Sequence, residues 1–463
     1  MAAESHWAGK RVGVVGLGRS NLALIRHLLQ RGAVVEGLDQ KGREELGPIA
    51  AELEALGVKL SLGPGYLEEL GRFEALALTP GMRKDLPQLV AARARGVEFT
   101  CEMQVFLQEC PAPVVGITGT AGKTTTSTLV ARVLSLAGRR VHLGGNIGTP
   151  LVDQLESIRS DDLVVLEMSS FQLELVTRSP NVAALLNLSP DHLDIHGSYR
   201  RYVEAKTRIF QFQRAGDEAV FNYDQEETRQ LAVGAPAGLC YFSLERRLER
   251  GAFISGNRAV WAEEGRVTPL FEISQVGLPG RHNLANCLAA AAIATLLGIG
   301  SDPIARAVAD FRGVPHRLEE VGEIGGVRFV NDSIATNPFR TLAALEALSG
   351  PVILLLGGYD KGVDFAQLAR RAVNRARVIL VFGQAAPKLA AAVERFLTPG
   401  TEAQLTRCRD LEEAFWQAWS RARPGDTILL SPACASYDAF RNFEERGERF
   451  RHLVRAIMQE GPR

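Results

Sequence analysis

The chain has 463 residues, of which 46% are hydrophobic and 23% are charged. These proportions exclude long disordered regions, collagen-like repeats and coiled coils, and they leave room for about three domains of roughly 150 residues. Because 53 basic residues balance 53 acidic ones, the overall positive charge that favours nucleic acids or anionic membranes is missing. We therefore expect no nucleic-acid partner and no membrane partner.

The cysteines and the apolar segments point to a cytoplasmic protein. Six cysteines occur without CxxC spacing, which favours a reducing compartment and packing thiols. The first apolar run, residues 12–18, is followed by Arg19 and has no basic flank, so it does not resemble a signal peptide. The longest apolar stretch, residues 288–300, is shorter than the about 20 residues that span a bilayer.

Short β-branched segments followed by helical patterns recur in three sets, as in parallel α/β sheets. The predicted strands are residues 12–16 and 33–39; 114–118, 163–167 and 182–188; and 327–332, 352–358, 377–383 and 427–431. Turn-forming residues at Pro111 and Pro113, and again at 313–315, separate the sets. We predict an α/β protein with domains at residues 1–110, 111–313 and 314–463.

The first strand ends in a glycine-containing turn, Gly16-Leu-Gly18, and Asp39 follows the second strand. This pattern is similar to a dinucleotide-binding fingerprint that lacks its third glycine. Binding of NAD is one interpretation, although a domain of about 110 residues leaves little room for separate hydride-transfer residues.

The strongest motif is GITGTAGKTTT at residues 116–126, which follows an apolar strand and opens a helix. Backbone N–H groups of such loops converge on phosphate oxygens, Lys123 adds a positive charge, and the Thr124 hydroxyl can bind Mg²⁺. Ile117 stands where the longer GxxxxGKT pattern has glycine. A plain glycine-rich turn is the alternative. The sequence predicts a nucleotide site at Gly119, Thr120, Gly122, Lys123, Thr124 and Thr125.

Two acidic segments lie further along the second set. A helix N-terminus contributes only ~0.3–1 kcal/mol toward binding of an anion, so we expect a divalent cation beside ATP. Glu167 ends a buried strand, where it could bind Mg²⁺ or cap the next helix. Asp191, His192 and Asp194 follow another strand, as a ligand cluster or as a turn with solvated charges.

Ten segments together resemble the Mur ligases, the ATP-dependent amino-acid ligases of bacterial peptidoglycan synthesis. They occur in the family's order over nearly the whole chain: GITGTAGKTTT at 116–126, GGNIGTPL at 144–151, LEMSSFQLE at 166–174, DHLDIHG at 191–197, EAKTRI at 204–209, LPGRHNLANCLAA at 278–290, GVPHRLE at 313–319, NDSIATNP at 331–338, LLGGYDKGVDF at 355–365 and SPACASYDAFRNFEERG at 431–447. The resemblance implies a Rossmann-like N-terminal domain for a UDP-sugar, a central P-loop domain for ATP, and a Rossmann-like C-terminal domain for the amino acid.

The resemblance also implies a mechanism, in which ATP converts a carboxylate into an acyl phosphate that an amine then attacks. Lys123 and two Mg²⁺ ions would neutralise the crowded anions. The ions would be held by Thr124, Glu167, His192 and Lys206, and Lys206 matches the family lysine that carries CO₂ as a carbamate. Helix spacing alone favours a solvated Lys206. Ligands from all three domains must meet, so we expect hinge closure.

The remaining site residues follow from the resemblance as well. Asn146 and His192 would contact the muramoyl-alanine end of the substrate, and Gly18, Asp39, Lys41, Thr79 and Gly81 would border its uridine diphosphate. Asn283, Arg317 and Asp332 would contact ATP. Thr336, Lys361, Ser436 and Phe443 match the D-glutamate site, although DKG alone is an ordinary turn and Ser436 an ordinary cap.

The chain departs from the family pattern at three positions. Ile334 stands where the family usually has lysine, Ala121 where asparagine is common, and Asn21 where glycine is common. We hypothesise that Lys361 or a nearby arginine replaces the missing positive charge. DKGVDF and SPACASYDAFRNF favour a ligase that adds D-glutamate to UDP-N-acetylmuramoyl-L-alanine. We expect a monomer. The alternatives are a ligase for alanine, diaminopimelate or folylpolyglutamate, and a non-catalytic nucleotide-binding relative.

Overall fold

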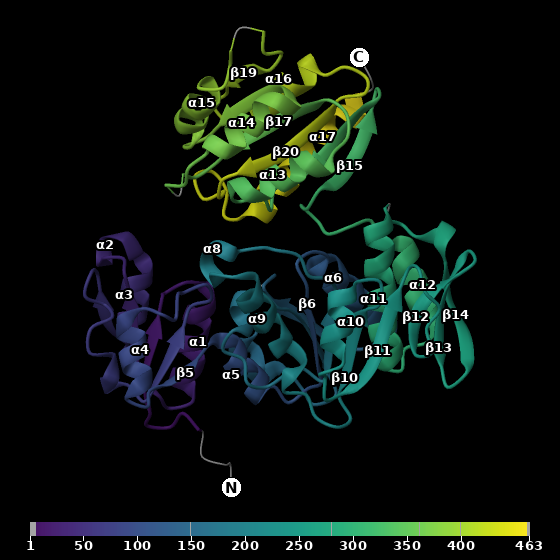
Figure 1. Ribbon diagram of the computed structural model, residues 1–463. Coiled ribbons are helices and arrows are strands. Elements are labelled where there is room, and N and C mark those ends of the chain that lie inside the picture. Colours follow the sequence, from purple (N-terminus) through teal and green to yellow (C-terminus); the bar gives the residue numbers. More distant parts are fainter. Residues whose placement is uncertain (1–5, 149, 279, 361, 399, 461–463) are drawn as a thin grey trace. The chain divides into compact units, whose positions relative to one another are not determined.

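The computed structural model describes residues 6–148, 150–278, 280–360, 362–398 and 400–460. Three separate sheets, each flanked by helices, follow one another along the chain (Figure 1). The prediction of a three-domain α/β architecture is therefore confirmed. The first two sheets lie in one compact unit, residues 1–311, and the third sheet forms a second unit, residues 312–463.

The first sheet has five parallel strands in the order β3-β2-β1-β4-β5. Its strands are β1 (Arg11–Val15), β2 (Val34–Asp39), β3 (Lys59–Leu62), β4 (Ala75–Leu78) and β5 (Glu98–Thr100). Its helices are α1 (Arg19–Gln30), α2 (Arg43–Leu46), α3 (Pro48–Ala55), α4 (Pro87–Ala94) and α5 (Glu102–Glu109). From β1 the chain runs outward through β2 to β3, and it then crosses to β4 on the other side of β1. The carboxyl ends of β1 and β4 therefore form a topological switch point, which is where open α/β sheets bind ligands.

The second sheet has nine strands in the order β14-β13-β12-β11-β10-β9-β6-β8-β7. The strands are β6 (Val114–Thr118), β7 (Val141–Gly145), β8 (Leu163–Glu167), β9 (Val182–Leu185), β10 (Glu218–Asn222), β11 (Gly238–Ser243), β12 (Gly251–Ser255), β13 (Arg258–Glu263) and β14 (Arg266–Glu272). The helices are α6 (Lys123–Leu136), α7 (Ser170–Leu173), α8 (Leu193–His196), α9 (Tyr199–Gln211), α10 (Glu226–Ala232), α11 (Arg281–Leu296) and α12 (Ser301–Asp310). The pairs β12–β13 and β13–β14 are antiparallel. β6 pairs with β8 and β9 in parallel, so the carboxyl ends of these three strands share one edge.

One apolar core joins the first two sheets. It runs from Leu24 on α1 and Phe106 on α5, through Val152 and Leu155 in a short 3-10 turn, to Val164 on β8. All of these side chains are buried. Removing apolar surface from water is the main favourable term in folding, so this continuous core holds the first two sheets together as one unit.

The third sheet has six strands in the order β15-β16-β20-β17-β18-β19, with β15 the single antiparallel member. The strands are β15 (Glu319–Ile324), β16 (Val327–Asn331), β17 (Val352–Gly357), β18 (Ala376–Phe382), β19 (Gln404–Arg407) and β20 (Thr427–Ala433). The helices are α13 (Pro338–Ala347), α14 (Ala366–Arg375), α15 (Ala386–Glu394), α16 (Leu411–Arg421) and α17 (Phe443–Glu460). Alternate residues of β17 face two cores: Leu354 packs in the cluster of α13, α14 and α15, and Leu355 in that of α16 and α17.

The six cysteines are buried free thiols, which confirms their predicted packing role. Within the described residues, no helix combines the length and the apolar character needed to cross a membrane.

Candidate active site

The phosphate loop lies at the carboxyl edge of the second sheet, between β6 and α6. Asn187, just beyond β9, fixes its shape: the Ala121 N–H donates to Asn187 Oδ1 at 2.9 Å, and Asn187 Nδ2 donates to the Ala121 carbonyl at 3.0 Å. The Thr120 N–H donates to the Asn187 carbonyl at 3.0 Å. The segment that follows the neighbouring strand therefore holds the loop in a defined conformation.

Gly122 is the residue that closes this loop. Its φ is +83°, a left-handed conformation that favours glycine, and a Cβ atom would lie 2.4 Å from Asn286 Oδ1 on α11. Thr124 and Thr125 lie in the first turn of α6, and Thr124 is buried. Our sequence reasoning missed Asn286, although the segment HNLAN places it one helical turn after Asn283.

Two lysines share one carbonyl oxygen of the loop. Lys123 Nζ donates to the carbonyl oxygens of Gly119 at 2.8 Å and Thr120 at 2.9 Å. Lys206 Nζ, from α9, donates to the same Gly119 oxygen at 2.9 Å and to Thr118 Oγ1 at 3.2 Å. The loop thus brings both candidate lysines to one point.

Lys206 is only 2% exposed. The interpretation of Lys206 as a solvated lysine, which helix spacing favours, is therefore wrong. The inner face of α9 carries it beneath the phosphate loop, where its ammonium lies 4.9 Å from the centre of the Tyr202 ring. Burial, followed by the positive charge of Lys123, lowers the pKa of Lys206 well below its ordinary value. An uncharged amine is the form that reacts with electrophiles such as CO₂.

Glu167 ends β8 beside this loop. Its Oε1 accepts a hydrogen bond from Asn146 Nδ2 at 2.8 Å, whereas Oε2 is buried with no hydrogen-bond partner among the described residues. Ser169, whose Oγ accepts from the Gln172 N–H at 3.3 Å, caps α7, so the capping interpretation of Glu167 is wrong. A buried carboxylate oxygen without a donor fits a hard cation such as Mg²⁺.

His192 lies at the start of α8 in a left-handed conformation, with φ of +51°. Its N–H donates to Asp191 Oδ1 at 3.0 Å, and its side chain is 51% exposed. Its ring centre lies 5.0 Å from that of Phe171. Within the described residues, no group of three His, Cys, Asp or Glu side chains could hold a metal ion alone.

A cleft of about 250 Å³ lies where the first sheet's loops meet the second sheet. It is lined by Arg19, Ser20, Pro80, Gly145, Asn146, Gly148, Pro150, Ser169, Phe171 and Gln172. Three of the residues predicted for the UDP-sugar, Gly18, Thr79 and Gly81, directly precede or follow Arg19 or Pro80 in the chain. Sequence reasoning missed Arg19, Ser169 and Phe171.

Asp39 lies at the carboxyl end of β2, and its carboxylate binds the backbone of the turn after β1 and of Lys41. Its Oδ2 accepts from the Leu17 N–H at 2.7 Å and its Oδ1 from the Lys41 N–H at 2.9 Å.

Asn21 Nδ2 donates to the carbonyl oxygens of Val15 and Gly16 at 2.9 and 2.8 Å. An asparagine therefore holds the turn at the position where the family commonly has glycine.

In the third sheet, Asp332 follows β16 and is buried. Its Oδ1 accepts from the Leu318 N–H at 3.1 Å and its Oδ2 from Ser431 Oγ at 2.7 Å. Burial raises the pKa of Asp332 to about 6, against the lowering effect of these bonds and of nearby Arg317 and Arg340. The carboxylate is thus fixed in place at the end of its strand.

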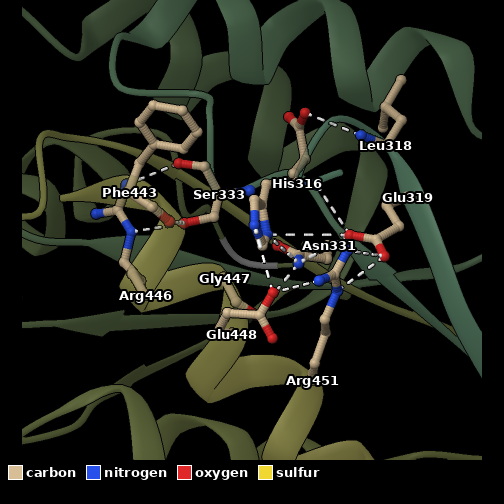
Figure 2. Close-up of polar contacts among 11 residues, drawn as sticks. His316, Leu318, Glu319, Asn331, Ser333, Phe443, Arg446, Gly447, Glu448 and Arg451 are labelled. Atoms are coloured by element: carbon tan, nitrogen blue, oxygen red, sulfur yellow. Dashed lines mark hydrogen bonds and ion pairs between the residues drawn. The ribbon is translucent and has the colours of Figure 1, made fainter. Parts of the chain in front are cut away.

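Arg317 lies between two residues in left-handed conformations, His316 with φ of +61° and Leu318 with φ of +42°. Figure 2 shows the network that holds this segment. The His316 N–H donates to Glu319 Oε2 at 2.8 Å, and Asn331 Nδ2 lies 3.0 Å from His316 Nδ1. Strain of this kind costs roughly 1–3 kcal/mol per residue and persists where the surroundings impose it.

Arg446 binds carbonyl oxygens at or beyond the ends of strands of the third sheet, and Figure 2 shows its contact with Ser333. It is fully buried and donates to the carbonyl oxygens of Ser333, Gly357, Cys434 and Ala435 at 2.9 to 3.4 Å. Burial lowers its pKa to about 10.

The predicted amino-acid residues lie around these strand ends. Ser436 is buried after β20, Thr336 follows β16, and the Phe443 carbonyl accepts from Ser333 Oγ at 2.8 Å. The helix after Ser436 begins only at Phe443, so Ser436 does not cap it. Lys361 lies outside the described residues.

The fold and the phosphate loop define a three-domain α/β protein with a P-loop nucleotide site. Three family models match the chain: the MurD-like N-terminal domain of Mur ligases at residues 10–101, the Mur ligase middle domain at 117–294, and the Mur ligase glutamate ligase domain at 316–434. The chain belongs to the Mur ligase family.

Curated relatives match over nearly the full length. A UDP-N-acetylmuramoylalanine--D-glutamate ligase from Symbiobacterium thermophilum is 46% identical over 97% of this chain and 98% of its own. The enzyme of the same name from Acetivibrio thermocellus is 42% identical over 97% of both chains.

Solved structures of other Mur ligases share the fold. The UDP-N-acetylmuramate-alanine ligase MurC of Thermotoga maritima has a TM-score of 0.51 at 21% identity, covering 96% of this chain and 99% of its own. MurF of Acinetobacter baumannii has a TM-score of 0.54 at 16% identity, covering 99% and 93%.

Proposed function

We propose that this protein joins D-glutamate to UDP-N-acetylmuramoyl-L-alanine with ATP, in the synthesis of peptidoglycan precursors. The names of relatives at 41–46% identity over 96% or more of the chain support this activity. The structural observation that carries it is the common location of the phosphate loop, the buried Lys206 and the unpartnered oxygen of Glu167. A ligase that activates a carboxylate with ATP needs these groups together.

The reaction has two steps. A carboxylate oxygen of the alanyl group attacks the γ-phosphorus of ATP, the bond to the β-phosphate oxygen breaks, and ADP leaves. The amine of D-glutamate then attacks the acyl carbon, phosphate leaves with the bonding electrons, and the amine loses a proton. Lys123 would offset negative charge during the first step, because a fixed cation in a water-poor site stabilises developing anions.

Magnesium, when bound, neutralises and orients the phosphate oxygens. We assign two ions to Thr124, Glu167, His192 and Lys206, with Lys206 carrying CO₂ as a carbamate. The unpartnered Glu167 oxygen and the lowered pKa of Lys206 support this assignment. Gly119, Thr120, Gly122, Thr125, Asn283, Arg317 and Asp332 would complete the ATP site.

The two other substrates are assigned to the sheet edges described above. Asn146, His192, Gly18, Asp39, Lys41, Thr79 and Gly81 would bind the UDP-sugar acid, which the cleft lined by Asn146 supports. Thr336, Lys361, Ser436 and Phe443 would bind D-glutamate. We further propose domains at residues 1–110, 111–313 and 314–463, and a monomer that works in the cytoplasm.

Phosphate release tests the proposal. The protein with ATP, Mg²⁺ and UDP-N-acetylmuramoyl-L-alanine should release phosphate when D-glutamate is added, and not with L-alanine or diaminopimelate. Release with another amino acid would reassign the acceptor. Binding of ATP without release for any amino acid would identify a non-catalytic relative, and tight binding of NAD to the first domain would favour the dinucleotide interpretation.

A further inference from the structure

Four side chains form a continuous polar row, which we call the His196 row: Lys84, Glu174, His196 and Ser170. Lys84, in the loop between β4 and α4, pairs with Glu174 Oε2. Glu174 Oε1 lies 3.0 Å from His196 Nδ1, and His196 Nε2 lies 3.0 Å from Ser170 Oγ. The row thus runs from Lys84, beside the first sheet, to Ser170 at the start of α7, beside the second sheet.

The hydrogen-bond donors and acceptors of this row can be assigned. A carboxylate only accepts, so His196 Nδ1 donates to Glu174, and Nε2 is left to accept the Ser170 hydroxyl proton. His196 is 4% exposed and Ser170 3%, so the bond between these two side chains is shielded from water. Burial is the main cause that lowers the pKa of His196 to about 4, which keeps the ring uncharged in neutral solution.

The His196 ring backs the wall of the cleft. Phe171 stacks on it with ring centres 4.9 Å apart and an angle of 4° between the planes. Phe171 also contacts the His192 ring, at 5.0 Å between centres, and lines the cleft together with Asn146. Aromatic pairs of this kind contribute about 0.5–1.5 kcal/mol beyond the area they bury.

The same ring also contacts the phosphate-loop side of the site. Its centre lies 5.4 Å from that of Tyr202, in an edge-to-face arrangement of 72°. Tyr202 shares a 2.7 Å hydrogen bond between its hydroxyl and Thr120 Oγ1. His196 is therefore held at both nitrogens and contacts an aromatic ring on each of two sides.

We propose that His196 is a positioning residue: held by Glu174 and Ser170, it fixes Phe171 in the wall of the cleft and thereby sets the affinity for the UDP-sugar acid. The identity of that ligand rests on the proposed function. His196 reaches the phosphate loop only indirectly, through the Tyr202 ring, whereas it stacks directly on Phe171 of the cleft. We therefore expect its loss to weaken binding of the UDP-sugar acid more than binding of ATP.

The test compares binding of two ligands to the full-length protein by calorimetry. His196→Asn keeps a donor near Glu174 and removes the ring platform. Its Kd for UDP-N-acetylmuramoyl-L-alanine should rise by about fivefold or more, with the Kd for ATP within about twofold of the unchanged protein. His142→Asn is the matched control, because His142 Nε2 makes a similar 2.8 Å contact with Asp162 Oδ2 on the same sheet without lining the cleft.

Two substitutions of Glu174 separate positioning from folding. Glu174→Gln keeps an acceptor oxygen for His196 and should retain the Kd for the UDP-sugar acid within about twofold, whereas Glu174→Leu should reproduce the loss seen in His196→Asn. This pair decides the question if His196→Asn does not fold.

Several results would overturn the inference. Unchanged binding in both His196→Asn and Glu174→Leu, or an equal loss of affinity for ATP and the UDP-sugar acid, would remove the positioning role. No binding of the UDP-sugar acid to the unchanged protein would overturn it together with its ligand. Selective weakening in a protein that releases no phosphate with D-glutamate would reject only the proposed function.

Discussion

Lys206 Nζ and Lys123 Nζ both donate to the carbonyl oxygen of Gly119, at 2.9 and 2.8 Å. Two ammonium groups that share one acceptor repel each other, and Lys206 is the more buried of the two. Burial and the positive charge of Lys123 lower the pKa of Lys206. We expect a division of roles, in which Lys206 reacts with CO₂ and Lys123 stays with the phosphates of ATP.

Replacing Lys206 by methionine tests that division. We expect kcat to fall by about a hundredfold or more, because the proposed carbamate ligand of the metal site would be lost. The free energy of unfolding should stay equal or rise, since a buried amine is exchanged for an apolar chain. Activity assays and thermal unfolding measure the two effects, with Lys59→Met, an exposed lysine on β3, as the control. A fall in both activity and stability would contradict the expectation.

The carbamate itself is measurable in the unchanged protein. The lowered pKa of Lys206 increases the share of its unprotonated amine, so labelled bicarbonate should give a carbamate signal at this residue by carbon NMR. The signal should be absent in Lys206→Met. Full activity after complete removal of CO₂ would exclude the modification.

Gly122→Ala should weaken ATP binding without unfolding the chain. The added methyl group meets Asn286 Oδ1 at 2.4 Å in a left-handed backbone conformation. We expect the KM for ATP to rise by about tenfold or more, corresponding to ~1.4 kcal/mol. Gly234→Ala, where the nearest atom lies 3.7 Å away, should leave the KM for ATP unchanged. Equal kinetics for both variants would show that the loop tolerates the methyl group.

Arg340 is the arginine best placed to replace the charge missing at Ile334. Its Nη1 donates to the Ile334 carbonyl at 3.1 Å, and its charge acts on Asp332. Arg340→Gln should lower kcat/KM for D-glutamate by about tenfold. Adding Ile334→Lys to this variant should restore most of the loss, whereas Ile334→Lys alone should gain less than about tenfold.

The control for this charge exchange is Arg371→Gln, which removes an exposed arginine paired with Glu346 on the neighbouring helix. It should leave the kinetics unchanged. A gain of more than about tenfold from Ile334→Lys alone would show that no residue compensates.

Glu102→Gln should stabilise the protein above neutral pH. Burial raises the pKa of Glu102 from 4.5 to about 7, so the folded state loses stability as pH rises from the unfolded value through 7 and the carboxylate ionises. The glutamine variant avoids this loss, and we expect a gain of roughly 2–3 kcal/mol near pH 8 that shrinks toward pH 5. Denaturant unfolding across pH measures it, with exposed Glu98→Gln as the control. A gain that does not depend on pH would contradict this origin.

The strands that carry the phosphate loop and the acidic residues were predictable from sequence. Apolar β-branched runs at 114–118 and 163–167 coincide with β6 and β8, because parallel strands buried on both faces are almost continuously hydrophobic. The order of the strands was not predictable, and that order brings Glu167 and Asn187 to the loop. Residues 258–272 were missed because β13 and β14 carry charged residues among their apolar ones.

Burial of charged side chains is where sequence patterns failed. Lys206 lies on α9 among charged neighbours and is typical of a solvated face, yet the ring of Tyr202 and the phosphate loop enclose it. The contact between His196 and Ser170 joins residues 26 positions apart. Neither relation has a signature in local spacing, because both depend on how helices pack over the sheet.

The apolar core shared by the first two sheets has a consequence for how the chain comes apart. Since Leu24, Phe106 and Val164 belong to one continuous cluster, heating should melt the segment up to residue 311 in a single transition rather than two. Cleavage near residue 110 would expose the apolar side chains of this cluster in both fragments, which would then tend to aggregate. Cleavage near residue 312 would give two fragments that each keep their apolar core.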